Sequence, residues 1–216
     1  MREDKGNQEE YFCYALTVLG DDTNRDRLWR TAASQRGYFT AAQALKAGYS
    51  YQAQHFHVGR RNWIRVDRGI YRFREYLDLP STDTDHLARW SLWSRDRAVV
   101  SHATALAVHD LGIANPAEIH LTVPPSFRAK DSAVVLHRAT LGAADIEQHE
   151  GFKVTTPLRA ITESAADAVD QDVVDSAVND ALSRGLTTRR RLLHAAQELG
   201  ARAELGVERA LRGATG

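Results

Sequence analysis

The 216-residue sequence contains a single cysteine and no long hydrophobic run. One cysteine, Cys13, excludes an internal disulfide framework and any zinc site built on cysteine ligands. No stretch of about 18 apolar residues occurs, so no segment is predicted to span a membrane. Acidic residues precede the first apolar stretch, where a secretory signal needs basic ones. These absences predict a soluble, cytoplasmic protein.

Catalytic and metal-binding motifs are also missing. Ser101 and His102 are adjacent, but no Gly-x-Ser-x-Gly elbow and no orienting acid accompany them, so Ser101 is predicted to cap a helix. The pairs His55/His57 and His102/His109 lack a third ligand at a matching spacing. The sequence therefore predicts a protein that is not an enzyme and has no metal site and no cofactor.

The formal net charge is zero, yet the charge is unevenly distributed. Residues 24–74 contain eleven lysines and arginines against two acids, a net charge of +9. Residues 1–23 have a net charge of −4 and residues 75–216 a net charge of −5. A basic segment between two acidic ones indicates a polyanionic partner for that segment alone. A solvated basic surface is the alternative.

Three helical patterns occupy the start of the basic segment. The first ends at Gly37, the second is capped by Thr40 and ends at Gly48, and the third runs from its cap Ser50 to about Gly59. In the second helix, the apolar residues predicted to face inward are Ala41, Ala44 and Leu45.

A strand-rich segment, "WIRVDRGIYRF" at residues 63–73, follows the third helix. Its apolar and aromatic residues favour strands, and the Asp67-Arg68-Gly69 break is a tight-turn signal. A helix pair followed directly by such a hairpin predicts a winged helix-turn-helix domain.

The composition changes after the polar segment "YLDLPSTDTD". A helix capped by Thr84 or Asp83, a short strand "AVVS" and a helix closed by Gly112 come first. The strands "EIHLTVP", "AVVLHRA" and "IEQHEGFKVTT" follow, and then helices, the first with Pro157 at its N1 position. The predicted fold class is α+β: an N-terminal winged helix-turn-helix domain and a C-terminal mixed α/β antitoxin-type domain ending in helices.

The predicted division of the chain has four parts. They are an N-terminal extension at 1–23, read as a helix or an arm, the winged helix at 24–75, a linker at 76–82 and the C-terminal domain at 83–216.

An ordered set of motifs runs through both domains. It begins with Gly48, "WIRV" at 63–66 and "RGIYR" at 68–72, and continues with "VVSHATALAVHDLG", "IHLTVP", "VVLHRATL" and "FKVTTPLRAITE". Spread over residues 24–200, this set resembles the AbiEi-type antitoxins of type IV toxin–antitoxin pairs. The pattern departs from the family at Gln54, usually apolar, at Arg61, often glycine, and at Glu163, usually aspartate.

The resemblance implies a repressor that binds inverted repeats in its own promoter and counteracts a nucleotidyltransferase toxin encoded beside it. A related arrangement precedes a Vsr-like endonuclease domain in other proteins, but this chain ends in helices without the acidic-and-lysine strand motif of that nuclease. Other readings are a toxin-binding inhibitor with little DNA-binding role and a stand-alone winged-helix transcriptional repressor. A nucleic-acid-processing enzyme ranks below these.

The candidate DNA contacts fall into two groups. The helix that follows Ser50 offers polar side chains to base edges, as glutamine does for adenine. Arginines suit phosphates, and Arg68 at the turn also suits a minor groove. The full set is Ser50, Tyr51, Gln52, Gln54, His55, Arg60, Arg61, Arg65, Arg68, Arg72 and Arg74. Palindromic operators call for two protomers on DNA.

A second basic cluster, Arg189, Arg190 and Arg191, stands at the start of a predicted helix, where the helix dipole disfavours cations. We interpret it as a contact to acid elsewhere in the chain, to a partner protein or to nucleic acid. A solvated surface is the alternative.

Overall fold

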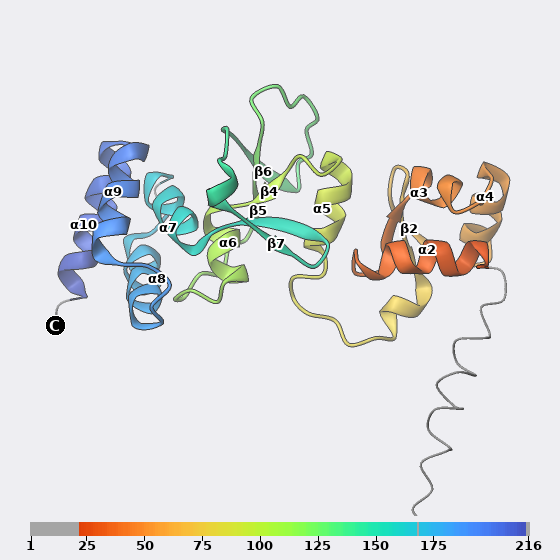
Figure 1. The fold of residues 1–216 in the computed structure, drawn as a ribbon, viewed down its shortest axis with the longest axis horizontal. Coiled ribbons are helices and arrows are strands. Elements are labelled where there is room, and N and C mark those ends of the chain that lie inside the picture. Colours follow the sequence, from red (N-terminus) through yellow and green to blue (C-terminus); the bar gives the residue numbers. More distant parts are fainter. Residues whose placement is uncertain (1–21, 168, 215–216) are drawn as a thin grey trace, which may run out of the picture. The chain divides into compact units, whose positions relative to one another are not determined.

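The computed structural model describes residues 22–167 and 169–214. Of the N-terminal extension predicted at 1–23, only residues 22 and 23 are described. Cys13 lies outside the described residues. The chain divides into two compact units, Met1–Asp78 and Leu79–Gly216, and each is described by itself. Both contain helices and strands, so the fold class is α+β (Figure 1).

The described part of the first unit, residues 22–78, combines three helices with a small sheet. Its sheet has three strands in the order β1–β3–β2, and both pairings are antiparallel. The elements are α2 (Asn24–Ala33), β1 (Tyr38–Thr40), α3 (Ala41–Lys46), α4 (Tyr51–Gly59), β2 (Trp63–Asp67), β3 (Ile70–Phe73) and the 3-10 turn η1 (Arg74–Leu77).

Local side-chain caps begin each helix of this unit. Thr40 accepts a hydrogen bond from the backbone N–H of Gln43, whose side chain accepts one from the backbone N–H of Thr40. Ser50 accepts from the backbone N–H of Ala53, which starts α4 where the sequence predicts. Such caps satisfy N–H groups that have no partner within a helix.

Two features of the first unit differ from the sequence predictions. Strand β1 was not predicted, because three residues are too few to show alternation; it forms by pairing with β3, with Tyr38 opposite Arg72. Leu45, predicted to face inward, is 38% exposed. The buried residues of α3 and its C-cap are instead the smaller Ala44 and Ala47.

The core of the first unit extends into η1. Buried Leu28, Phe39, Trp63 and Phe73 form its centre. Tyr76, which the sequence assigns to a linker, packs on Trp29 with ring centroids 5.2 Å apart. The packed part of the unit thus continues beyond residue 75.

The second unit is built around a mixed five-stranded sheet in the order β6–β5–β4–β8–β7. Pairs β5/β6 and β4/β8 are parallel, and pairs β4/β5 and β7/β8 are antiparallel. The strands are β4 (Val99–Val100), β5 (Ile119–Val123), β6 (Val134–Arg138), β7 (Ile146–His149) and β8 (Phe152–Thr155), with the 3-10 turn η2 (Ala143–Asp145) before β7. All five strands fall within the predicted strand segments.

Six helices belong to the second unit in the described part of the chain. They are α5 (Leu87–Ser94), α6 (His102–Val108), α7 (Pro157–Ala166), α8 (Gln171–Ser183), α9 (Arg189–Leu199) and α10 (Ala201–Gly213). Helix α5 packs on β8, and α6 packs on β5 and α7. Figure 1 shows α7–α10 gathered as a group beside the sheet, and their buried residues continue its core.

Helix α5 begins later than predicted. The cap was expected at Asp83 or Thr84, but the helix starts at Leu87 after turns at residues 83–86. The buried Asp85 accepts a hydrogen bond from the Thr82 hydroxyl at 2.7 Å. This local side-chain bond holds the preceding segment in a turn rather than a helix.

Within the described ranges, every helix is too short or too polar to cross a lipid bilayer.

Gly37 provides the first test of this packing. Its φ is +84°, and a Cβ atom there would lie 2.2 Å from Cγ of Tyr76. We expect Gly37→Ala to lower the free energy of unfolding of the first unit by about 2 kcal/mol or more, measured by urea denaturation. Gly59→Ala is the matched control: a Cβ there meets nothing within 4 Å, so stability should be unchanged or slightly higher. Equal effects of both substitutions would contradict the packing.

Candidate nucleic-acid interface

Helix α4 is held at one end by a turn that requires glycine. Gly48 has a φ of +103°, a backbone region that favours glycine, and a Cβ there would lie 2.5 Å from the Asn24 side chain. That side chain donates to the carbonyl of Gly48 at 3.1 Å, which ties the turn to α2. The turn between α3 and α4 therefore depends on glycine at position 48 and on the hydrogen bond from Asn24.

One face of α4 is exposed and carries polar and aromatic groups. Tyr51 is 69% exposed and Phe56 is 56% exposed, and Gln52 and His55 are exposed beside them. Positions three and four apart lie on the same side of a helix, so Gln52, His55 and Phe56 share this face. The capping residue Ser50 is also exposed.

Gln54 lies on the opposite side, which corrects its place among the candidate contacts. It is 2% exposed, and its amide nitrogen donates to the carbonyls of Ala41 and Tyr49 at 3.2 and 3.1 Å. The side chain joins α4 to α3 and the turn between them. A polar residue at a usually apolar position is thus accommodated by hydrogen bonds to backbone carbonyls.

The hairpin of β2 and β3 is attached to α4 through aromatic rings. Trp63 is 2% exposed and stacks on the His57 ring at 4.8 Å with an interplanar angle of 15°. The rings of Phe39 and Tyr49 lie 4.8 and 5.0 Å from Trp63. Burial lowers the pKa of His57, so the imidazole packs as a neutral ring. His57 thus packs on Trp63, whereas His55 is exposed.

Five of the six arginines predicted to contact phosphate are exposed. We call Arg60, Arg61, Arg65, Arg68 and Arg74 the exposed arginine set. Arg60 lies over the Phe56 ring at 5.4 Å, and Arg68 occupies the turn of the hairpin. Within the described residues, none of the five forms an ion pair, so their charges are available to an external anion.

Arg72 differs from the exposed arginine set. Its Nε donates to the carbonyl of Arg36 at 3.1 Å, and its guanidinium lies over the Tyr38 ring at 4.7 Å. Strand alternation places Arg72 beside Ile64, on the opposite side of the hairpin from Arg65. Arg72 serves the fold of the first unit, which corrects its assignment to phosphate.

Arg61 occupies an unusual backbone position directly before the hairpin. Its φ is +59°, in the left-handed region that glycine adopts more readily. The observed conformation gives a physical reason why glycine suits this position. Here the chain has an arginine instead, which adds a cation at the strained corner.

The arginines of α2 are engaged within the first unit. Arg25 pairs with Glu75 at 2.7 Å, and Arg30 pairs with Asp22. Arg27 donates to the carbonyls of Asp22 and Ala47. The available positive charge of this unit is therefore concentrated at the end of α4, on the hairpin and at Arg74 directly after it.

One arginine of the second cluster, Arg189, has a role within the fold. Arg189 donates to the carbonyl of Leu211 near the end of α10, where backbone carbonyls lack helical partners. Arg190 and Arg191 are exposed and remain candidate partner contacts. The backbone N–H of Arg191 donates to the capping hydroxyl of Thr188 at 3.3 Å.

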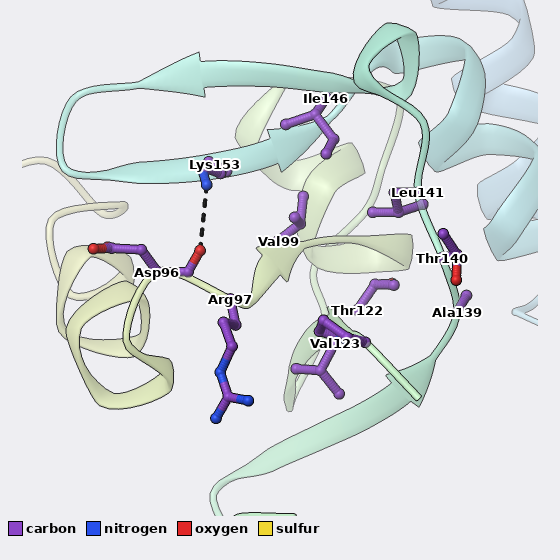
Figure 2. Close-up of a pocket in the computed structure, with 11 residues that line it drawn as sticks. Asp96, Arg97, Val99, Thr122, Val123, Ala139, Thr140, Leu141, Ile146 and Lys153 are labelled. Atoms are coloured by element: carbon purple, nitrogen blue, oxygen red, sulfur yellow. Dashed lines mark hydrogen bonds between the residues drawn. The ribbon is translucent and has the colours of Figure 1, made fainter. Parts of the chain in front are cut away.

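The second unit contains a cavity of about 290 Å³, and Figure 2 shows the residues that line it. Lys153 donates to the carbonyl of Asp96 at 3.2 Å, and Arg97 lies over the Phe127 ring at 4.7 Å. Val99 and Ile146 contribute aliphatic surface. Asp96 also lines the cavity, so both signs of charge are present, and the lining residues offer no His–Ser or His–Cys pair for nucleophilic catalysis.

The predicted helical histidine pair belongs to two separate places. His102 lies against His120 and His137 from the sheet, whereas His109 follows the end of α6 and contacts His149. Sequence reasoning missed the two strand histidines. These two histidines share a face of two parallel neighbouring strands. That could be recognised only once the register of β5 and β6 is known.

A matched pair of glutamines tests the placement of α4. We expect Gln54→Ala to lower the free energy of unfolding by about 1–3 kcal/mol, because two backbone carbonyls lose their donor. Gln52→Ala should change it by less than about 0.5 kcal/mol, as is typical of exposed positions. Thermal denaturation followed by circular dichroism compares them. A larger loss for Gln52→Ala would contradict the facing of α4.

The comparisons with known proteins add a fold likeness. No family model matches the sequence, and no curated protein matches it. Among solved structures, the RV2827C protein from Mycobacterium tuberculosis is similar, with a TM-score of 0.59 and 15% sequence identity. The match covers 89% of this chain and 77% of that one. At this identity, the likeness shows a shared fold and no more.

Proposed function

We propose that the chain is a DNA-binding antitoxin that represses its own toxin–antitoxin operon. The observation that carries the DNA-binding part is the exposed face of α4 next to five exposed arginines without an ion-pair partner in the described residues. The first unit then acts as a winged helix-turn-helix domain, with α4 as recognition helix and the β2–β3 hairpin as wing.

The two groups of side chains have different roles in this proposal. Gln52, Tyr51 and His55 lie where the first turns of a recognition helix meet base edges, and Ser50 caps that end. The exposed arginine set contacts phosphates and supplies affinity without reading sequence. Arg68, at the hairpin turn, reaches a minor groove. Inverted repeats bind two protomers, one reading each half-site.

The antitoxin role rests on the resemblance to AbiEi-type proteins over residues 24–200. In this proposal the second unit counteracts a nucleotidyltransferase toxin in the cytoplasm and is not itself an enzyme. The mixed sheet with its covering helices supplies a stable body, and exposed Arg190 and Arg191 on α9 supply a charged contact for the toxin.

A mobility-shift titration against the protein's own upstream DNA tests the first part. We expect Arg65→Ala/Arg68→Ala to weaken specific retention and to reduce the slope of log affinity against log salt by at least about one, because the phosphate contact of Arg65 and the minor-groove contact of Arg68 are both lost. Gln52→Ala should instead reduce the preference for the operator over unrelated DNA.

Arg209→Ala, an exposed arginine on α10, is the matched control and should leave retention unchanged. A flat salt response, or equal loss in the control, would contradict the assignment of the exposed arginine set. Absence of retention at low salt would favour the reading as a toxin-binding inhibitor with little DNA-binding role.

Growth rescue on co-expression with the adjacent nucleotidyltransferase tests the second part. We expect Arg190→Glu/Arg191→Glu to reduce rescue while DNA retention stays at the wild-type level, because only the partner contact is reversed. Arg189 is left intact since it donates to the end of α10. Unchanged rescue and unchanged retention would make these two arginines ordinary solvated surface.

A further inference from the structure

Three imidazole rings and a carboxylate gather between the sheet and the helices of the second unit. His102 is the first residue of α6, His120 lies on β5, His137 lies on β6 and Asp167 follows α7. The rings of His102 and His137 stack at 3.5 Å, and those of His120 and His137 at 5.2 Å. Ligand atoms of His102, His137 and Asp167 all lie within 4.8 Å of one another.

The register of the sheet brings the two strand histidines together. His120 is opposite Val135 and Thr122 is opposite His137 in the parallel pair, so both histidines project from the same face. Nδ1 of His120 and Nε2 of His137 are 3.0 Å apart. This contact leaves Nδ1 of His137 without another hydrogen bond in the described residues.

His102 is oriented by groups on its other side. Its Nδ1 is 2.9 Å from the buried hydroxyl of Ser101 and 3.8 Å from Oε2 of Glu163. Glu163 is itself held by Nε of Arg159 at 2.7 Å, and its Oε2 is buried with no hydrogen-bond partner. Nε2 of His102 is thereby left facing away from this acidic group.

The backbone at His102 supports a positioned ring. Its φ is +53°, an uncommon value for a residue with a side chain, and one that clusters at functional positions. The strained residue is the same one whose Nδ1 lies 2.9 Å from the Ser101 hydroxyl.

We propose that His102, His137 and Asp167 bind one divalent transition-metal ion of the zinc class. Histidine ligands in metal sites usually give their other ring nitrogen to a carboxylate, a carbonyl or another acceptor, which fixes the tautomer. His102 has this arrangement through Ser101, and His137 has it through His120.

The ligand set decides which ions fit. Two imidazoles and one carboxylate suit zinc and its neighbours, whereas magnesium and calcium prefer oxygen ligands alone. The bound ion would join α6, β6 and the end of α7, with a fourth position open to water.

A second group of potential ligands, His109, Glu147 and His149, is the less suited of the two. His109 approaches the carbonyl of Thr155 at 2.7 Å, but Glu147 is exposed and His149 is only half-buried on β7. No buried carboxylate orients either histidine among the contacts of the described residues. His102 is buried and His137 half-buried, so the ion is assigned to the cluster that they form with the exposed Asp167.

Calorimetric titration of the chelator-treated full chain with zinc tests the assignment. We expect one equivalent of zinc to bind. Co²⁺ should also bind and give the visible absorption of a four-coordinate site. Mg²⁺ should not bind. His137→Ala and Asp167→Asn should abolish the binding. His120→Ala and Ser101→Ala should weaken it by about 10- to 100-fold, the usual effect of losing an orienting partner.

His194→Ala, an exposed histidine on α9, is the control and should bind zinc as the wild type does. Asp167 is exposed, so its variant reports binding even if His137→Ala fails to fold. Absence of zinc binding by the wild type, retention in Asp167→Asn, or loss on His149→Ala in place of His137→Ala would each overturn the proposal.

Discussion

The packing around the indole ring of Trp63 fixes the relation between α4 and the β2–β3 hairpin. Trp63 begins β2, contacts Phe39 of β1, and stacks on His57 of α4. Removing a buried tryptophan typically costs about 3–5 kcal/mol, so this contact is a large share of the stability of a small unit. The proposed DNA interface depends on it, because base-reading and phosphate-binding side chains stand on the two elements that Trp63 joins.

The arginines of the first unit differ in their partners rather than in their chemistry. Arg72 bonds to a backbone carbonyl and lies over an aromatic ring, and Arg25 has a carboxylate partner. Arg65 and Arg68 have neither, and both are exposed. An external polyanion gains most from charges that the fold has not already neutralised. The distribution of internal partners therefore confines the proposed contact to the end of α4 and the hairpin, although basic residues occur throughout the unit.

The second unit contains a buried polar group that an ordinary core would exclude. Glu163 is 4% exposed, and burial raises its pKa while Arg159 opposes that shift. A charge in such a place needs a partner, and the (i, i+4) ion pair with Arg159 supplies one. His102 lies on the other side of the same carboxylate. Glu163 thus lies between its ion-pair partner Arg159 and His102 of the histidine cluster.

The sequence by itself determined the features that depend on neighbouring residues. The caps Thr40 and Ser50 were predictable because each bonds to an N–H three residues on, and strand alternation marked β5, β6 and the β7–β8 hairpin. Tertiary structure alone decided which way Gln54 faces, that β1 forms, and that His102 meets His137. Those outcomes depend on groups 13 to more than 30 residues away, whose register and packing no local pattern encodes.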